Sequence, residues 1–300
     1  MTSSKLALIT VLFATAMLAA CQRDAPDTTV EPVADVGVVS GSATAPDGLP
    51  VAYDVRGSGD VNLVFVHCWS CNREFWREQL DVFADDYRVV ALDLGGHGQS
   101  AATRESWSIL GLAQDVKAVA DELELDNIVL IGHSMGGPVS LEAARLMSGR
   151  VIGVIAADTL HDADLNFPPD QAEQMIAAFE ADFAGTMAGM FTGMAAEGMD
   201  TDLRDWIVTV ASNANPEVAV ALLRDFGNLD FPALFSNAGV PIRGINAMPS
   251  MMTPTTNVEG NRKYADFDAT LMEDVGHFLQ LENPQAFNPL LRAYLLELER

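Results

Sequence analysis

The segment around residue 134 limits the fold of this chain more than any other feature. Residues 128–131 form a short apolar run, which continues into a Gly-x-Ser-x-Gly turn at 132–136 and then into a helix-like segment. A serine in a sharp turn between a strand and a helix projects its hydroxyl group out of the sheet, and this requires neighbours without side chains. Gly132 and Gly136 meet the requirement. The pattern predicts that Ser134 is a nucleophile; the alternative is a glycine-rich turn with a solvent-facing serine.

Other segments surround the serine in a definite order. An apolar run at 61–66 ends in His67-Cys68-Trp69, and a strand-like segment at 267–275 is followed by Gly-His-Phe. A third run, at 87–92, leads into Asp-Leu-Gly-Gly-His-Gly-Gln-Ser. These segments resemble the α/β-hydrolase family, and its serine esterases in particular, from about residue 38 to the end except for a poorly matched middle third. The resemblance implies an α/β fold with a mostly parallel central sheet flanked by helices and a helical cap inserted after strand 6.

The domain organisation follows from these segments. With 300 residues, 49% of them hydrophobic, the chain can bury a large core. We expect a signal peptide at 1–20, a flexible tether at 21–36, an α/β-hydrolase core formed by 37–158 and 239–300, and a helical cap at 159–238.

Apolar periodicity divides the expected cap into helices. It predicts one helix from about 168–170 to Gly185, a second over 203–210 and a third from Asn215 to Gly227. Four methionines in this region either form a pliable apolar wall of the site or pack the cap on the core: Met187, Met190, Met194 and Met199.

The general base can be sought among five histidines. His133 adjoins the serine, and His67 and His97 lie in earlier turns that look structural. The resemblance orders the triad as serine, acid and histidine along the chain, which leaves His161 and His277. His277 occupies the Gly-His-Phe segment after the last predicted strand, so we expect it to be the base; the alternative is a surface loop histidine.

The acid is less clearly marked. Most family members carry it after strand 7, here 241–247, but the loop that follows offers no carboxylate before Glu259. Strand 6, at 151–157, is followed at once by Asp158, and some family members place the acid there. We therefore predict Asp158 as the acid and Glu259 as the alternative; a merely structural aspartate is the third option. Asp93, at the end of strand 4, is expected to fix its loop.

The resemblance also assigns an oxyanion hole, formed by the backbone N–H groups of Met135 and Trp69. The Met135 assignment has an independent basis, because the first N–H groups of a helix are free to face negative charge. Cys68 departs from the family, which has glycine at this position for a tight turn. Cys68 and Cys71 form a Cys-x-x-Cys pair that can be a local disulfide or a redox pair, and no second pair completes a zinc site.

The amino terminus resembles a bacterial lipoprotein signal. Lys5 precedes an apolar segment at 6–18, which is too short to span a bilayer and ends in Leu-Ala-Ala before Cys21. We expect Cys21 to carry lipid and to anchor the protein in the cell envelope. The resemblance implies an aspartate after the cysteine in lipoproteins that stay at the inner membrane. Gln22 stands there instead, so we expect the outer membrane, with the protein facing the periplasm. The alternative is an ordinary secretory signal with an incidental cysteine.

Charge narrows the partners further. A formal net charge of −25 makes nucleic acid and anionic lipid surfaces unfavourable partners. The expected partner, a small-molecule acyl substrate, is implied by the resemblance and not by the charge. The resemblance implies hydrolysis of a carboxylic ester with a small or medium apolar acyl group, through an acyl-enzyme and without metal or organic cofactor. Two alternatives remain: a cofactor-independent haloperoxidase or perhydrolase on the same scaffold, and a non-catalytic ligand-binding lipoprotein.

Overall fold

The computed structural model describes residues 37–165, 169–249 and 255–300. The expected signal peptide, the tether and Cys21 lie outside these residues. Within the described part, no single helix is long and apolar enough to cross a membrane, although α6 (Thr201–Ser212) and α7 (Pro216–Phe226) reach that length and composition as a pair bent by 90°.

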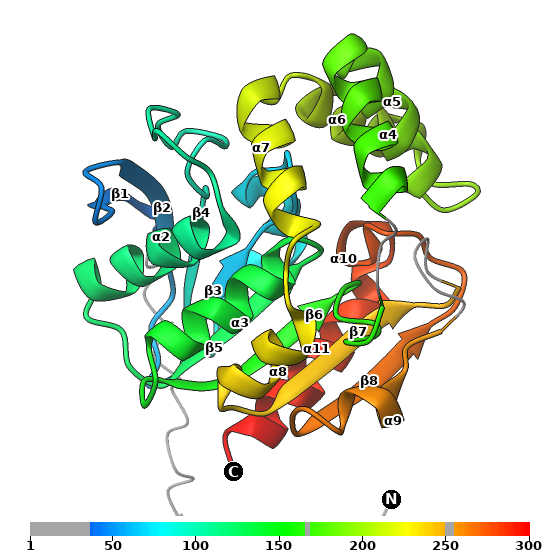
Figure 1. The fold of residues 1–300 in the computed structure, drawn as a ribbon. Helices are drawn as coiled ribbons and strands as arrows, with labels where there is room; N and C mark the ends of the chain where they lie inside the picture. Colours follow the sequence, from blue (N-terminus) through cyan, green and yellow to red (C-terminus); the bar gives the residue numbers. More distant parts are fainter. Residues whose placement is uncertain (1–36, 166–168, 250–254) are drawn as a thin grey trace, which may run out of the picture. The chain divides into compact units, whose positions relative to one another are not determined.

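An eight-stranded sheet forms the centre of the fold, in the order β1-β2-β4-β3-β5-β6-β7-β8 (Figure 1). The six strands in the run β4-β3-β5-β6-β7-β8 are parallel to one another. β1 and β2 form an antiparallel hairpin, and β2 pairs antiparallel with β4. This confirms the predicted mostly parallel sheet. The strand bounds are β1 Val39–Thr44, β2 Pro50–Arg56, β3 Asn62–Val66, β4 Arg88–Leu92, β5 Ile128–His133, β6 Val151–Ala157, β7 Ile242–Ala247 and β8 Phe267–Met272.

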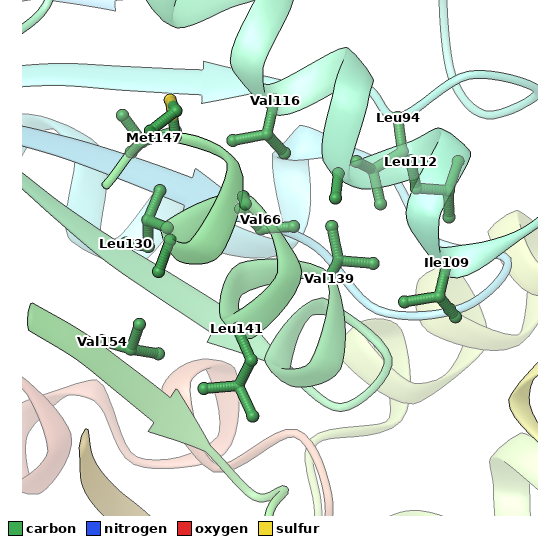
Figure 2. Close-up of a cluster of buried hydrophobic side chains, with 14 of the residues drawn as sticks. Val66, Leu94, Ile109, Leu112, Val116, Leu130, Val139, Leu141, Met147 and Val154 are labelled. Atoms are coloured by element: carbon green, nitrogen blue, oxygen red, sulfur yellow. The ribbon is translucent and has the colours of Figure 1, made fainter. Parts of the chain in front are cut away.

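Helices cover both faces of the sheet, which explains why its central strands read as unbroken apolar runs. On one face lie α2 (Ile109–Glu122), α3 (Gly136–Leu146) and α8 (Phe231–Ala238), and on the other lie α1 (Arg77–Ala84) and α11 (Pro284–Leu298). Figure 2 shows Val66 and Leu130 of the sheet meeting Val116 of α2 and Val139 of α3 in the first of these two cores. Both faces of the sheet are thereby buried beneath its carboxyl-terminal loops.

A second group of helices lies beyond the carboxyl ends of the strands (Figure 1). It comprises α4 (Pro169–Ala181), α5 (Phe183–Met194), α6 (Thr201–Ser212) and α7 (Pro216–Phe226). Gly185 does not end the first helix, because Asp182 accepts the Gly185 N–H at 3.0 Å and so caps a new helix, α5. The predicted start of α7 after Asn215 and its end before Gly227 are confirmed.

The helix α8 closes the segment expected to form the cap, yet it lies on the sheet. Leu234 and Phe235 belong to the same core cluster as Val139 of α3. The helical layer over the strand ends therefore consists of α4–α7, and we call these four helices the cap. Short helical turns complete the fold: η1 (Arg73–Trp76), α9 (Val258–Asn261) and α10 (Leu279–Glu282).

Asp93 ties together the loops that follow β3 and β4. Its buried carboxylate accepts the Arg73 N–H at 2.8 Å, the Arg73 Nη1 at 2.6 Å and the Gln99 N–H at 2.7 Å. Replacing Asp93 with alanine should lower the free energy of unfolding by about 2–4 kcal/mol, because the Arg73 and Gln99 N–H groups lose their acceptor, although Arg73 keeps its ion pair with Asp54 at 2.8 Å. Urea denaturation measures this loss. The matched control is Asp126→Ala, whose side chain is 76% exposed in its pair with Arg150; a similar cost for both variants would contradict the role of Asp93.

Candidate active site

The turn at Ser134 has the geometry that the sequence predicts. Ser134 joins β5 to α3 with a φ of 54°, a left-handed conformation that a residue with a side chain adopts only when its surroundings impose it. The Ser134 N–H donates to the carbonyl oxygen of Ala157 at 3.1 Å, which ties the turn to the end of β6. A Cβ atom on Gly132 would collide with the Gly136 carbonyl, so the close approach of these two residues requires glycine.

Asp158 and His277 meet at the ends of β6 and β8. The Nδ1–H of His277 donates to Asp158 Oδ2 at 2.6 Å, and the Ala247 N–H donates to Oδ1 at 2.9 Å. Burial raises the pKa of Asp158, but its hydrogen bond with His277 and the charge of that imidazole outweigh burial, so the pKa of this carboxyl lies below its usual value. The carboxylate is thus held ionised beside the imidazole.

His277 is fixed from two further directions. Its N–H donates to the carbonyl oxygen of Met194 at the end of α5, at 2.9 Å. Its own carbonyl oxygen lies 2.8 Å from His133 Nε2, while Gln280 Nε2 lies 3.3 Å from His133 Nδ1. With Gln280 as donor to Nδ1, Nε2 carries the proton and donates to His277. His133 therefore connects the serine turn to the histidine loop.

Acid should act on stability through His133. Burial, with a smaller contribution from His277, lowers the pKa of His133 to about 3. Because an unfolded histidine titrates near 6.5, the unfolded chain binds this proton first, and the free energy of unfolding falls as pH drops from about 6.5 towards 3. The loss from this residue should reach about 2 kcal/mol at about pH 5. Urea denaturation at pH 7 and pH 5 tests this: His133→Gln should show a smaller pH dependence, and an unchanged dependence would contradict it.

A cavity of 430 Å³ contains these groups. Ser134, Asp158 and His277 all line it, together with Trp69 and Met135. Apolar side chains form most of the remaining wall. From the cap and its junctions come Leu165, Met175, Met190, Phe191, Met194, Leu222, Leu223, Phe226 and Phe231, and from the loop after β8 comes Phe278. Met190 and Met194 thus contribute to the wall, whereas Met187 is buried in the cap core.

Two backbone N–H groups of the cavity wall are available to an oxygen atom. Within the described residues, neither the Trp69 nor the Met135 amide donates a hydrogen bond. The Trp69 turn is supported by His67, whose Nδ1 lies 2.8 Å from the Cys68 carbonyl oxygen and whose Nε2 accepts the Leu94 N–H at 3.0 Å. Burial lowers the pKa of His67 well below its usual range, so the imidazole is neutral and its Nδ1–H donates to Cys68.

Cys68 and Cys71 are joined by a disulfide, and both are buried. Glu259 is not brought to the cavity. It lies in α9, pairs with Arg262 and has a side chain that is 84% exposed. Glu259 therefore does not compete with Asp158 for His277. Within the described residues, His, Cys, Asp and Glu side chains nowhere form a group of three that could hold a metal ion.

Sequence reasoning missed a polar network behind Asp158. His161 Nε2 lies 3.5 Å from Asp158 Oδ1, and His161 Nδ1 lies 3.3 Å from the Thr256 hydroxyl oxygen. That oxygen accepts Asn246 Nδ2 at 2.8 Å, and Asn246 Oδ1 accepts the Thr159 N–H at 3.1 Å. The available signal was Asn246 itself, a polar residue inside the apolar strand β7.

The serine turn, the paired aspartate and histidine, and the sheet beneath them define an α/β-hydrolase. The chain belongs to the alpha/beta hydrolase family, whose model matches residues 63–290. This confirms the prediction of an enzyme of that family. A solved structure, an esterase from Exiguobacterium antarcticum, shares the fold with a TM-score of 0.78 and 20% identity, covering 85% of this chain and 99% of its own.

Two curated relatives match different lengths of the chain. One is 37% identical over 108 residues, or 36% of this chain: the dihydrolipoyllysine-residue acetyltransferase component of an acetoin cleaving system from Cupriavidus necator. The match spans only 29% of that relative's length. The other, a non-heme chloroperoxidase from Streptomyces lividans, is 28% identical over 85% of this chain and 99% of its own length.

Proposed function

We propose that this protein is a serine hydrolase that cleaves carboxylic esters with a small or medium apolar acyl group. The observation that carries the proposal is the 2.6 Å hydrogen bond between His277 and Asp158 in a cavity that Ser134 also lines. The cavity volume of 430 Å³ suits a small ligand, and its wall is mainly apolar.

In the proposed reaction, His277 Nε2 removes the proton from the Ser134 hydroxyl as its oxygen attacks the acyl carbonyl. The N–H groups of Met135 and Trp69 stabilise the oxyanion of the tetrahedral intermediate. His277 then gives its proton to the departing alcohol, and an acyl-enzyme remains. His277 next activates water, which releases the acid and restores Ser134. Asp158 holds the imidazole in the tautomer that carries its proton on Nδ1.

The test is turnover of nitrophenyl acetate, butyrate, octanoate and palmitate, together with labelling by a fluorophosphonate. We expect turnover of the short and medium esters, poor turnover of palmitate, and covalent labelling at Ser134. A chain that neither turns over any ester nor becomes labelled would contradict the proposal and favour a ligand-binding lipoprotein.

A second candidate function is peroxide chemistry on the same scaffold. It is favoured by the similarity to the Streptomyces lividans chloroperoxidase over nearly that protein's whole length. In this reaction hydrogen peroxide would replace water in resolving the acyl-enzyme and yield a peracid. Bromination of monochlorodimedone that requires both peroxide and a carboxylic acid would support it; ester turnover without any such bromination would favour the esterase.

We also propose that Cys21 carries lipid and anchors the protein in the bacterial envelope, facing the periplasm. The supporting feature is the apolar segment at 6–18 that leads through Leu-Ala-Ala to this cysteine. Detergent partitioning of the full chain, with and without Cys21→Ser, tests the proposal. Wild type should enter the detergent phase and the variant the aqueous phase, whereas equal partitioning into buffer would exclude the anchor.

A further inference from the structure

The turn after β3 carries a feature that the proposed reaction does not yet explain. Cys68 and Cys71 close a disulfide around Trp69 and Ser70, with a Cα–Cα distance of 5.2 Å. Both cysteines are only 2% exposed, and Ser70 is 1% exposed. Cys68 and Trp69 also line the cavity, so this small ring lies at the active site and includes the Trp69 amide that the mechanism uses.

The left-handed residue of this turn is Ser70, with a φ of 59°, while Cys68 lies outside the positive-φ region. A side chain at residue 68 is thus compatible with the turn. The ring is closed a second time by the Cys71 N–H, which donates to the Cys68 carbonyl oxygen at 3.3 Å. Ring closure by a covalent bond removes conformations that a free turn of the same residues would sample.

The side chain of Trp69 contacts three helices of the cap, α4, α5 and α7. Its indole Nε1–H donates to the carbonyl oxygen of Ala219 in α7 at 2.9 Å. Its ring lies 5.2 Å from the ring of Phe179 in α4 and 6.4 Å from that of Phe191 in α5, centroid to centroid. A displacement of any of these helices would act on the Trp69 side chain, so its backbone amide needs a separate restraint.

We propose that the Cys68–Cys71 disulfide is this restraint: it positions the Trp69 N–H as an oxyanion donor and makes ester hydrolysis dependent on the oxidised state. The inference rests on the proposed function. Cys68 and Cys71 act here as positioning residues, since the group that meets the substrate oxygen is the Trp69 amide. The enzyme is thereby suited to an oxidising compartment, where such a disulfide persists.

The redox step is a thiol–disulfide exchange. A dithiol reductant supplies two electrons and two protons, the Cys68–Cys71 bond breaks into two thiols, and the reductant closes its own disulfide. The ring around Trp69 then opens. The Trp69 amide then loses the covalent restraint on its orientation. The orientation matters because an oxyanion donor must be directed at the developing charge.

The experiment uses the full chain with Cys21→Ser, in which Cys68 and Cys71 are the remaining cysteines. Titration with a thiol reagent under denaturing conditions should find no free thiol before reduction and two after it. The chain is compared oxidised, reduced and reoxidised, beside the double variants Cys68→Ala/Cys71→Ala and Cys68→Ser/Cys71→Ser. If one double variant fails to fold, the other double variant and the reduced wild-type pair of cysteines still test the proposal.

Loss of a whole oxyanion donor typically costs a factor of about 100–1,000 in rate, so loosening one should lower kcat by about 10- to 100-fold. KM should change by less than about threefold, because the ground-state carbonyl makes weaker use of the donor. Reoxidation should restore kcat, and the reductant should have no effect on the two double variants.

A boronic acid that forms a tetrahedral adduct with Ser134 separates positioning from general damage. Its affinity should fall with kcat in the reduced chain and the variants, while the affinity of the product alcohol, which carries no acyl oxygen to meet the Trp69 N–H, stays unchanged. Equal losses for both ligands, or a kcat within threefold of the oxidised chain once two thiols are counted, would overturn the inference. If the oxidised chain itself lacks turnover and fluorophosphonate labelling, the proposed function fails instead.

Discussion

Replacing Ser134 with alanine should lower kcat for short nitrophenyl esters by about 10⁶-fold and abolish labelling by a fluorophosphonate. In the proposed mechanism both the attack and the acyl-enzyme depend on the Ser134 hydroxyl, and a methyl group can form no covalent intermediate. The turn itself should survive, because its shape depends on the close approach of Gly132 and Gly136 rather than on the hydroxyl. Substrate binding should therefore change little, and a complex with intact ester should become observable.

A matched control lies in the helix that follows. Ser140 in α3 is fully buried, and its hydroxyl has no hydrogen-bond partner among the described residues. Ser140→Ala removes the same atom from the same part of the fold, and it should leave kcat within about threefold of wild type because no partner is left unsatisfied. Equal losses in Ser134→Ala and Ser140→Ala would indicate damage to the turn and would contradict the assigned nucleophile.

Features carried by contiguous residues could be predicted from the sequence. The strand, Gly-x-Ser-x-Gly turn and helix around Ser134 form one local unit, because the turn needs glycine at two fixed positions. The helix α7 was equally readable, with Asn215 and Pro216 at its start and Gly227 at its end. Gly185 was misread as a stop, because the capping carboxylate of Asp182 starts a new helix at that point.

Features that depend on distant residues could not be read in this way. The contact between His133 and the carbonyl oxygen of His277 joins residues 144 positions apart, and the one between His161 and Thr256 spans 95 positions. Such contacts arise only when parallel strands bring their carboxyl ends to one edge. Likewise, α8 follows the cap in sequence, but the burial of Phe235 against the sheet places it in the core.

Replacing Asp158 with asparagine should lower kcat by about 10⁴-fold at neutral pH, with little change in the shape of the site. Asparagine can keep its carbonyl oxygen where Asp158 Oδ1 accepts the Ala247 N–H. Its amide NH₂ then replaces Oδ2 and donates to His277 Nδ1, so the imidazole proton is forced onto Nε2. In that tautomer Nε2 cannot accept the Ser134 proton.

The exposed alternative acid supplies the control for this prediction. Glu259→Gln should leave kcat within about twofold of wild type, because it disturbs only a surface ion pair with Arg262. Steady-state kinetics of both variants, with urea denaturation to verify folding, distinguishes the two carboxyl groups. Near-normal turnover in Asp158→Asn would move the acid away from residue 158. We expect kcat to fall only in Asp158→Asn, because Asp158 holds the hydrogen bond with His277 whereas Glu259 is directed to the protein surface.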